Sequence, residues 1–401
     1  MKTSESTANI ISQDQIYYLN TFGARTPVVL TKGKGCQVTD LDGKTYLDLV
    51  AGIAVNVLGH GNDHLVTTIA KQAGQLIHCS NLYYNVPQTE LAKRLTQWAD
   101  MEKIFFCNSG AEANEAAIKL VRGYFNRSGS ERYRFYSALN SFHGRTLATI
   151  TATGQPKYNK PFAPLPEGFD YLPFNDIEAL KTVVEKSDTA GIILELVQGE
   201  SGIHPVSQAY ATQAEKLCRD NGVMLIVDEI QTGMGRTGSF TACQTYGIRP
   251  DIITMAKGLA GGLPIGAVLA QGDVTTGFTP GSHGTTFGGN PLACAGSMAV
   301  LDEFERLDLI SAVRQQGTYF LNVLQDVQAT FSDRIADVRG KGLMLAIDFY
   351  KNEAPAMRDN LLAAGVLVNA TGPNTLRLLP PLIITTAEID QFRNILTDVL
   401  A

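Results

Sequence analysis

Val223-Met224-Leu225-Ile226-Val227-Asp228-Glu229 is the stretch of the chain that indicates its fold most clearly. A short apolar run of this kind is typical of a strand buried on both faces, as in a parallel sheet. The run ends in Asp228 and Glu229. Such an acid needs a hydrogen bond or a cation, because an unpaired buried charge is costly. A cationic ring nitrogen of a ligand would be one partner, and a helix cap or an arginine would serve equally well.

Similar apolar runs precede and follow this stretch, separated by segments with a helical pattern. The expected strands span residues 104–107, 134–138, 170–174, 191–197, 223–228, 252–255 and 267–270. Helices are expected between them, for example at 111–125 and 207–220. This alternation predicts an α/β fold with one large, mostly parallel, seven-stranded sheet.

The two ends of the chain have a different pattern. Residues 36–39 and 44–49 alternate around Asp42-Gly43, which predicts a β-hairpin. After residue 301 a long amphipathic helix leads into short strands at 343–349, 366–369 and 375–379 and a last helix from Thr386, an α+β pattern. We therefore expect an N-terminal segment (1–60) packed with a small domain (301–401), and a large ligand-binding domain (61–300) between them in sequence.

Composition excludes several classes of protein. The 401 residues carry a formal charge of -6 without a basic block, so nucleic acid is not expected as a partner. The first residues lack the order of a signal peptide and no apolar run is long enough to cross a bilayer, so we expect a cytoplasmic protein. The six cysteines are scattered singly, without the spacing of disulfides or of a zinc site, and no metal is expected.

In open parallel sheets ligands bind at the carboxyl ends of the strands. One such end is Asn108-Ser109-Gly110-Ala111, where a strand turns into a helix. The free backbone N–H groups of a helix start suit a phosphate. A plain turn with Ser109 as N-cap is the alternative, and the segment taken alone favours it.

Another strand end delivers Lys257, followed by the glycine-rich Gly258-Leu259-Ala260-Gly261-Gly262. A lysine at this edge of the sheet can be desolvated, and a desolvated amine loses its proton readily enough to form a Schiff base. The small residues beside it leave room for a planar cofactor. Most lysines are solvated surface charges, so this segment indicates a reactive lysine only when it is taken together with the other strand ends.

The segment Gly233-Met234-Gly235-Arg236-Thr237-Gly238 matches the G-x-G-x-x-G pattern of dinucleotide-binding turns. Asp228 and Glu229 precede it and would repel a pyrophosphate, and no convincing ribose-binding acid ends the next strand. We interpret it as a flexible glycine loop, which leaves a nicotinamide oxidoreductase as the weakest alternative.

Several segments together resemble the class III aminotransferases, and most closely the acetylornithine aminotransferases. The likeness runs from about Tyr18 to the C-terminus. The segments are Asn108-Ser109-Gly110-Ala111-Glu112-Ala113, Ser141-Phe142-His143-Gly144-Arg145, Asp228-Glu229-Ile230-Gln231, Ala256-Lys257-Gly258 and Thr285-Thr286-Phe287-Gly288-Gly289-Asn290-Pro291. The resemblance implies pyridoxal 5'-phosphate as cofactor and a fold-type I homodimer with active sites at the subunit interface.

The resemblance also implies roles for cofactor-binding residues. Lys257 would hold the cofactor covalently and later move a proton, and Asp228 would keep the pyridine nitrogen protonated. Gln231 would hydrogen-bond the ring oxygen, and Phe142 would stack on the ring. The turn at Ser109, Gly110 and Ala111 would hold the phosphate, with Thr286 reaching it from the neighbouring subunit.

On the substrate side, the resemblance assigns two arginines, whose planar fork suits carboxylates. Arg145 would hold the distant carboxylate of an acylated ornithine, and Arg377 the carboxylate beside the reacting amine of glutamate. The terminal-amine substrate has no carboxylate for Arg377, so Glu200 would neutralise that arginine during its half-reaction. Thr285 would lie near the substrate.

The resemblance implies a ping-pong transfer from N2-acetyl-L-ornithine to 2-oxoglutarate, giving N-acetylglutamate 5-semialdehyde and L-glutamate, a reaction of arginine biosynthesis. Free ornithine, succinylornithine and 4-aminobutyrate are alternative donors. Ile53 stands about where ornithine aminotransferases carry a tyrosine, which argues against free ornithine. A non-catalytic α/β binding protein, which would need neither Lys257 nor Asp228, is the alternative from another class.

Overall fold

The large sheet is the central element of the computed structural model, which describes residues 4–23 and 25–401. Its strand order is β4-β12-β11-β10-β7-β5-β6, and only β12 runs antiparallel to its neighbours. The prediction of one mostly parallel seven-stranded sheet is confirmed, with strand bounds shifted by up to three residues. The strands are β4 (Lys103–Cys107), β5 (Arg134–Ala138), β6 (Phe169–Leu172), β7 (Thr189–Leu194), β10 (Met224–Asp228), β11 (Ile252–Met255) and β12 (Gly266–Ala270).

Helices cover both faces of this sheet. Along β10, Leu225 and Val227 belong to the buried cluster that includes residues of α9 (Gln208–Asn221), whereas Ile226 packs with residues of α5 (Gly110–Arg127). Successive side chains of a strand point to opposite faces, so a strand between two helical layers has to be apolar throughout. This arrangement explains the uninterrupted apolar run that ends at Asp228.

The remaining helices and strands of the large domain surround this core. They are α3 (Asp63–Ala73), α4 (Val86–Ala99), α6 (Leu147–Ala152), α7 (Pro156–Asn159), α8 (Ile177–Val184), α10 (Ala242–Tyr246), α11 (Pro291–Arg306) and the short hairpin β8 (Val197–Gln198) and β9 (His204–Pro205). Lys257 begins a 3-10 turn, Lys257–Ala260, one residue after the end of β11. The expected domain boundary at residue 300 falls inside α11 and stays a prediction.

The C-terminal region forms a second sheet of order β13-β14-β17-β16. Its elements are α12 (Leu309–Thr330), β13 (Ile335–Lys341), β14 (Met344–Phe349), α13 (Ala354–Ala363), β16 (Asn369–Ala370), β17 (Thr375–Leu378) and α14 (Thr386–Leu400). The strands expected at 343–349 and 375–379 and the last helix are confirmed, and β13 was not expected. The strand expected at 366–369 is wrong as a single element, because β15 (Val366–Leu367) joins another sheet.

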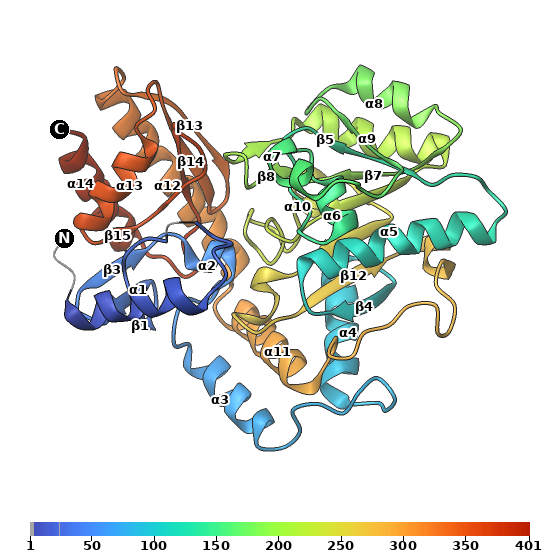
Figure 1. The fold of residues 1–401 in the computed structure, drawn as a ribbon, viewed down its shortest axis with the longest axis horizontal. Coiled ribbons are helices and arrows are strands. Elements are labelled where there is room, and N and C mark those ends of the chain that lie inside the picture. The colour runs from blue at the N-terminus through green and yellow to red at the C-terminus, as the bar shows by residue number, and fades with distance from the viewer. Residues whose placement is uncertain (1–3, 24) are drawn as a thin grey trace.

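The N-terminal segment lies beside this C-terminal region (Figure 1). The predicted hairpin is confirmed as β2 (Gln37–Asp40) and β3 (Thr45–Asp48), and β1 (Leu30–Lys34) extends it. β15 pairs with β3 in parallel, so residues far apart in sequence share one sheet. Also in this segment are α1 (Glu5–Tyr17), which was not expected, and the short turn α2 (Ala51–Ala54). The expected first domain begins at residue 1, and residues 1–3 lie outside the described part.

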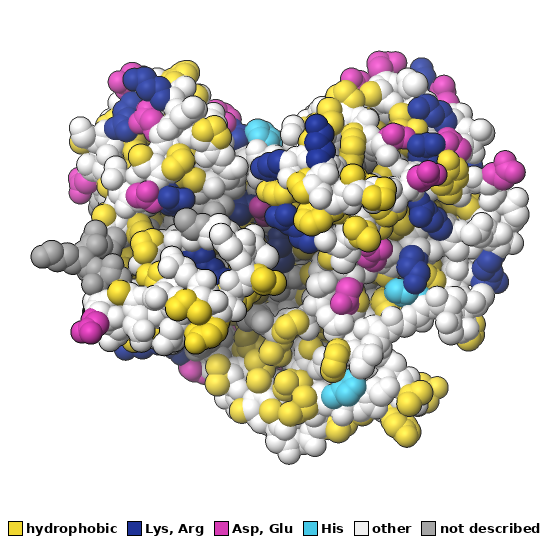
Figure 2. Space-filling model, in the orientation of Figure 1, with side chains coloured by type: hydrophobic (Ala, Val, Ile, Leu, Met, Phe, Trp, Pro, Cys, Tyr) yellow, Lys and Arg dark blue, Asp and Glu magenta, His cyan; other side chains and the backbone are white. Residues whose placement is uncertain are grey.

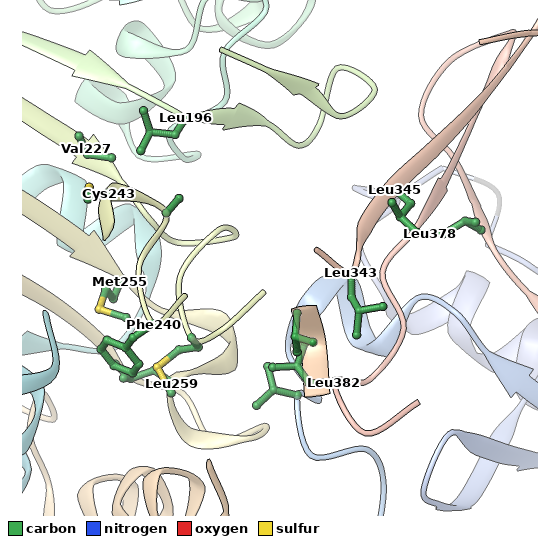
Figure 3. Close-up of a cluster of buried hydrophobic side chains, with 14 of the residues drawn as sticks. Leu196, Val227, Phe240, Cys243, Met255, Leu259, Leu343, Leu345, Leu378 and Leu382 are labelled. Atoms are coloured by element: carbon green, nitrogen blue, oxygen red, sulfur yellow. The ribbon is translucent and has the colours of Figure 1, made fainter. Parts of the chain in front are cut away.

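One buried hydrophobic cluster joins the two domains. Figure 3 shows side chains such as Phe240 and Leu259 from the large domain and Leu343 and Leu382 from the small domain, all members of that cluster. Because apolar burial is the main favourable term in folding, a shared core fixes the two domains against each other. Within residues 4–23 and 25–401, no helix has the length and apolar character needed to span a membrane.

Candidate active site

A cavity of about 430 Å³ opens at the carboxyl ends of β4, β10 and β11. This is the edge of the sheet at which ligands are expected. Most of the residues predicted from the sequence line it together. They are Ser109, Gly110, Ala111, Phe142, Arg145, Glu200, Asp228, Gln231 and Lys257.

Asp228 is held at the floor of this cavity by neutral and basic partners from distant parts of the chain. Its Oδ2 lies 2.8 Å from Asn114 Nδ2 and 2.8 Å from His143 Nδ1, and its Oδ1 accepts a hydrogen bond from Ile230 N at 3.0 Å. Asn114 is fixed in turn, because Thr254 Oγ1 donates to its Oδ1 at 2.8 Å. These bonds satisfy both oxygens of the buried carboxylate.

The contact with Asp228 changes the pKa of the His143 imidazole. Burial alone lowers the pKa of the His143 imidazole, but the hydrogen bond and charge of Asp228 outweigh burial and raise that pKa above its ordinary value. Neither His143 nor Asn114 was predicted from the sequence as a partner of Asp228. The available signal was Asn114 itself, a polar residue on the otherwise apolar, buried face of α5.

Lys257 follows β11 with its backbone in the left-handed region, at φ 46. A non-glycine residue in that region is strained and is held there by the surrounding structure. Burial lowers the pKa of the Lys257 amine, and the charges of Glu200 and Asp228 only partly oppose this effect. Within the described part of the chain, no hydrogen bond or ion pair engages its Nζ. The amine is therefore positioned to react as a nucleophile.

The turn before α5 has both features considered from the sequence, a serine cap and free backbone N–H groups. Ser109 caps the helix, and its Oγ accepts a hydrogen bond from Glu112 N at 3.2 Å. The N–H groups of Gly110 and Ala111 precede the first intrahelical bond and lie on the cavity wall. An anion at this end would meet free donors and the positive end of the helix dipole.

Arg377 lies behind the cavity and is neutralised by a carboxylate on the cavity wall. Its NH1 lies 2.8 Å from Glu200 Oε1 and 3.0 Å from Gly199 O, and its NH2 donates to Asn369 Oδ1 at 2.9 Å. Burial raises the pKa of Glu200, but the charges of Arg377 and Lys257 lower it further, below its ordinary value. Arg377 itself does not line the cavity, whereas Glu200 does.

Arg145 presents a cation without an acidic partner. Its guanidinium lies 4.2 Å from the ring centroid of Tyr158 and 5.6 Å from that of Phe142. Within residues 4–23 and 25–401, it forms no ion pair with a carboxylate. Aromatic faces stabilise a cation and leave its N–H groups free, so this arginine can receive a carboxylate from a ligand.

Thr285 and Thr286 are not brought to the cavity of their own chain. Thr285 Oγ1 accepts hydrogen bonds from Asn108 Nδ2 at 3.3 Å and from Gly288 N at 3.1 Å, and Thr286 is exposed. Neither threonine is among the lining residues. Their predicted roles near the substrate and the phosphate therefore depend on a second subunit.

Glu195 is a buried acid of the cavity that was not predicted from the sequence. Its Oε2 accepts a hydrogen bond from the backbone N–H of Phe142 at 2.9 Å. Burial raises the pKa of its carboxyl to about 7, although the charge of His143 acts in the opposite direction. This acid lies at the end of β7, so strand ends were the right place to look.

Two further expectations concern other kinds of site. Residues 233–238 were interpreted as a flexible loop, but the loop is buried, and Arg236 NH1 donates to Leu343 O at 3.0 Å and to Pro380 O at 2.6 Å. It joins the two domains and is not free to bind a dinucleotide. No group of three or more His, Cys, Asp or Glu side chains suited to a metal ion occurs among the described residues.

Comparisons with known proteins agree with this geometry. The family model "Aminotransferase class-III" matches residues 19–400. The chain belongs to the class III aminotransferases. The acetylornithine aminotransferase of Caldanaerobacter subterraneus is 47% identical over 393 residues, which cover 98% of this chain and 99% of that protein. That of Methanocaldococcus jannaschii is 47% identical over 395 residues, covering 98% of each chain.

Solved structures of this family superpose on nearly the full length of this chain. The ornithine aminotransferase of Toxoplasma gondii has a TM-score of 0.94 at 29% identity, covering 100% of this chain and 95% of that chain. The acetylornithine aminotransferase of Elizabethkingia anophelis has a TM-score of 0.88 at 31% identity, covering 98% of both. Enzymes with either name share the fold, so the fold does not distinguish these donors.

The enzyme is a pyridoxal-phosphate-dependent transaminase. The residues of the cavity fit that cofactor: a reactive amine, a fixed carboxylate for a ring nitrogen and a helix start for a phosphate lie around one space. In addition, Gln231 Oε1 is buried without a hydrogen-bond partner within the described part of the chain. A buried acceptor of this kind is costly unless a ligand supplies a donor, and a ring hydroxyl would do so.

Proposed function

We propose that this aminotransferase moves the terminal amino group of N-acetylornithine to 2-oxoglutarate, giving N-acetylglutamate 5-semialdehyde and glutamate. The observation that carries the proposal is the difference between its two arginines. Arg145 is free to take a carboxylate, whereas Arg377 is neutralised by Glu200 at 2.8 Å. A donor with one distant carboxylate and a dicarboxylic acceptor need this combination.

Each residue of the cavity has a defined task in this reaction. Pyridoxal phosphate, when bound, supplies the electron sink that stabilises a carbanion at the reacting carbon. Lys257 would hold the cofactor covalently and, with its amine free, would carry a proton to and from the substrate carbon. Asp228 would keep the pyridine nitrogen protonated, and the turn from Ser109 to Ala111 would hold the phosphate. Phe142 would pack against the ring, and Gln231 would bind the ring oxygen.

The substrate residues then act in turn. In the half-reaction of the donor, Arg145 binds the distant carboxylate and Glu200 stays on Arg377, so no charge is left unpaired. In the half-reaction of glutamate, the substrate carboxylate replaces Glu200 on the fork of Arg377. The exchange lets one cavity accept two substrates of different charge.

Several donors share these requirements, and one feature favours an acylated ornithine. Ile53 is 39% exposed, two residues before Val55 of the cavity wall. An aliphatic side chain offers no hydrogen bond to the charged α-amino group of free ornithine, whereas an acylated nitrogen carries no charge. Succinylornithine and 4-aminobutyrate are the remaining alternatives.

The donor is tested by measuring kcat/KM for N-acetylornithine, ornithine, succinylornithine and 4-aminobutyrate, each with 2-oxoglutarate. We expect N-acetylornithine to exceed free ornithine by at least about tenfold, because a site without a partner for the extra ammonium rejects it. A preference for free ornithine would overturn the proposed donor and leave the transaminase intact.

The enzyme also acts as a homodimer in this proposal. Thr286 and Phe287 are exposed on a loop outside their own cavity, and apolar side chains gather on the lower part of the face in Figure 2, where α3 lies. Contiguous exposed apolar surface is typical of an interaction site. The exposed apolar residues of this region include Val66, Leu76, Ile77, Leu82, Tyr83, Tyr84 and Val86.

The dimer is tested by the mass in solution of a Tyr84→Asp/Phe287→Asp variant, which should fall to that of a monomer with loss of activity. Tyr350→Asp changes an exposed aromatic residue of the small domain and serves as the control. A dimeric and fully active double variant would contradict the proposal.

Free thiols at all six cysteines are consistent with a cytoplasmic location, which we also propose.

A further inference from the structure

Glu200 lies in the turn of the β8–β9 hairpin, which projects from the large domain toward the small one. Within the hairpin, the turn is held by weak contacts, such as Ser201 Oγ to Gln198 Oε1 at 3.3 Å. Gly202 and Ile203 have φ angles of 118 and 58, the second in the left-handed region, which is unfavourable for isoleucine. A turn of this kind needs an external anchor to hold Glu200 in place.

Arg339 of β13 provides such an anchor. Its Nε lies 3.1 Å from Gly202 O and 2.9 Å from Ile203 O, and its NH2 donates to Gly202 O at 2.6 Å. Its NH1 lies 2.7 Å from carboxylate oxygens of both Asp337 and Asp348. The guanidinium thus binds the turn with one side and is fixed by the small domain with the other.

Arg339 and Arg377 lie in one row across the small-domain sheet. Arg339 is in register with Ala346 of β14, and Ala346 is in register with Arg377 of β17. Residues in register on neighbouring strands share a face of the sheet, so the two arginines stand about 10 Å apart on one face with a small side chain between them. Both contact the same turn, Arg339 through backbone carbonyls and Arg377 through Gly199 O and the side chain of Glu200.

The two arginines therefore differ in what a substrate can displace. A substrate carboxylate competes with Glu200 for Arg377, but it cannot replace the carbonyl groups that Arg339 binds. We propose that Arg339 is a positioning residue that keeps the turn in place while the side chain of Glu200 leaves Arg377 and returns to it. Arg339 thereby determines how well the enzyme accepts a terminal-amine substrate in addition to the α-amine of glutamate. This proposal rests on the proposed function.

The consequence for catalysis is unequal between the two half-reactions. Without the anchor, Glu200 would return to Arg377 less often, and Arg377 would stay unpaired while a terminal amine is bound. Glutamate brings its own carboxylate to Arg377 and does not need Glu200 there. Loss of Arg339 should therefore impair the terminal-amine half-reaction selectively.

The test measures the two half-reactions separately, by single-turnover absorbance of the holoenzyme with N-acetylornithine and with glutamate. In Arg339→Gln, we expect kcat/KM for N-acetylornithine to fall about tenfold, as for the loss of charge-assisted hydrogen bonds, while that for glutamate changes by less than about twofold. Arg334→Gln is the matched control: Arg334 precedes β13 and binds Glu353 and Leu400 O, away from the hairpin. Its ratio of the two rates should equal that of the wild type.

A fall of both half-reactions by the same factor in Arg339→Gln would overturn the proposal, because it would indicate a merely structural role. If that variant fails to fold, Asp337→Asn removes one exposed carboxylate from the guanidinium and should shift the ratio in the same direction by a smaller factor. An unchanged ratio in Asp337→Asn would then overturn it. If the wild type uses free ornithine instead, the proposed donor fails, and the same ratio measured with ornithine still decides the role of Arg339.

Discussion

The cofactor half and the substrate half of the cavity stabilise charge in different ways. In the cofactor half, Asp228 is held by Asn114, His143 and the backbone of Ile230, all within the large domain. In the substrate half, Arg377 comes from the small domain and is neutralised by one side chain on a turn. In the proposed mechanism the first arrangement stays in place throughout, whereas a competing carboxylate opens the second.

This difference matches what each half has to do. The cofactor chemistry is the same in both half-reactions, so a fixed charge with several hydrogen bonds is advantageous and avoids reorganisation. The two substrates differ by one carboxylate, so a buried cation with a removable partner avoids the cost of an unpaired charge in either half-reaction. Substitutions in the two halves should therefore affect the half-reactions equally in one case and unequally in the other.

The largest effect is expected for Lys257→Ala. Both half-reactions should fall by about 10⁴-fold or more, because the variant loses the covalent anchor and the proton-transfer group together. The purified variant should also lack the visible absorbance of the bound cofactor. Lys216→Ala, on the exposed face of α9, is the control and should retain both. Full activity of Lys257→Ala would refute the assignment.

The next effect separates two adjacent acids. Asp228→Asn should lower both half-reactions about 100-fold to 1,000-fold and by similar factors, because a preorganised charge beside the cofactor is lost. Glu229→Gln should stay within about tenfold of the wild type, since that acid is buried outside the cavity with Thr232 Oγ1 and Cys243 N as partners. Single-turnover rates measure both variants. The reverse order would show that the wrong acid faces the cofactor.

The fold was predictable from the sequence where one physical requirement dominates. Strands between two helical layers must be apolar on both faces, so β10 and β12 appear as short apolar runs. β13 was not predicted as a strand, because it carries Asp337, Arg339 and Lys341 and lies at the edge of its sheet. Its charged side chains serve contacts with distant residues, which no local pattern reveals.

The site was predictable to the same extent. Lys257 and Asp228 end strands of one sheet, so their meeting at one cavity follows from the topology. The partners of Asp228 come from α5 and from the loop that contains His143, and their side chains meet only after the chain has folded. Glu195 was likewise hidden, because an acid after an apolar strand can equally be a cap or a salt-bridge partner.

The buried acid Glu195 should make stability depend on pH. Its pKa is about 7 in the folded protein because of burial, against 4.5 for an ordinary glutamate. Between these values the unfolded chain releases the proton and the folded chain keeps it, so the free energy of unfolding falls as pH rises, by up to about 3 kcal/mol. Glu195→Gln removes this slope.

Urea unfolding at several pH values measures the effect. The Glu195→Gln variant should gain stability relative to the wild type as pH rises from 4.5 to 7, and the difference should stay constant above that range. The measurement at pH 4.5 is the internal control, because the wild-type carboxyl is then protonated in the folded protein. Parallel stability curves for the two proteins would contradict the raised pKa.

The smallest effect concerns the turn beside the substrate half. Ala51, Gly52, Ile53 and Ala54 all have φ between 49 and 65, a left-handed turn that costs L-residues about 1–2 kcal/mol each. Ile53→Gly relieves this strain at a β-branched, partly exposed residue, and after the entropy cost of glycine we expect the free energy of unfolding to rise by about 0.5–1 kcal/mol.

Ile10→Gly is the matched control, since Ile10 has similar exposure but lies in α1, where glycine should cost about 1 kcal/mol. Opposite signs of the two changes in chemical unfolding would place stored strain on the substrate side of the cavity, where the side chain of Glu200 also has to move. Equal destabilisation would show that the turn is relaxed.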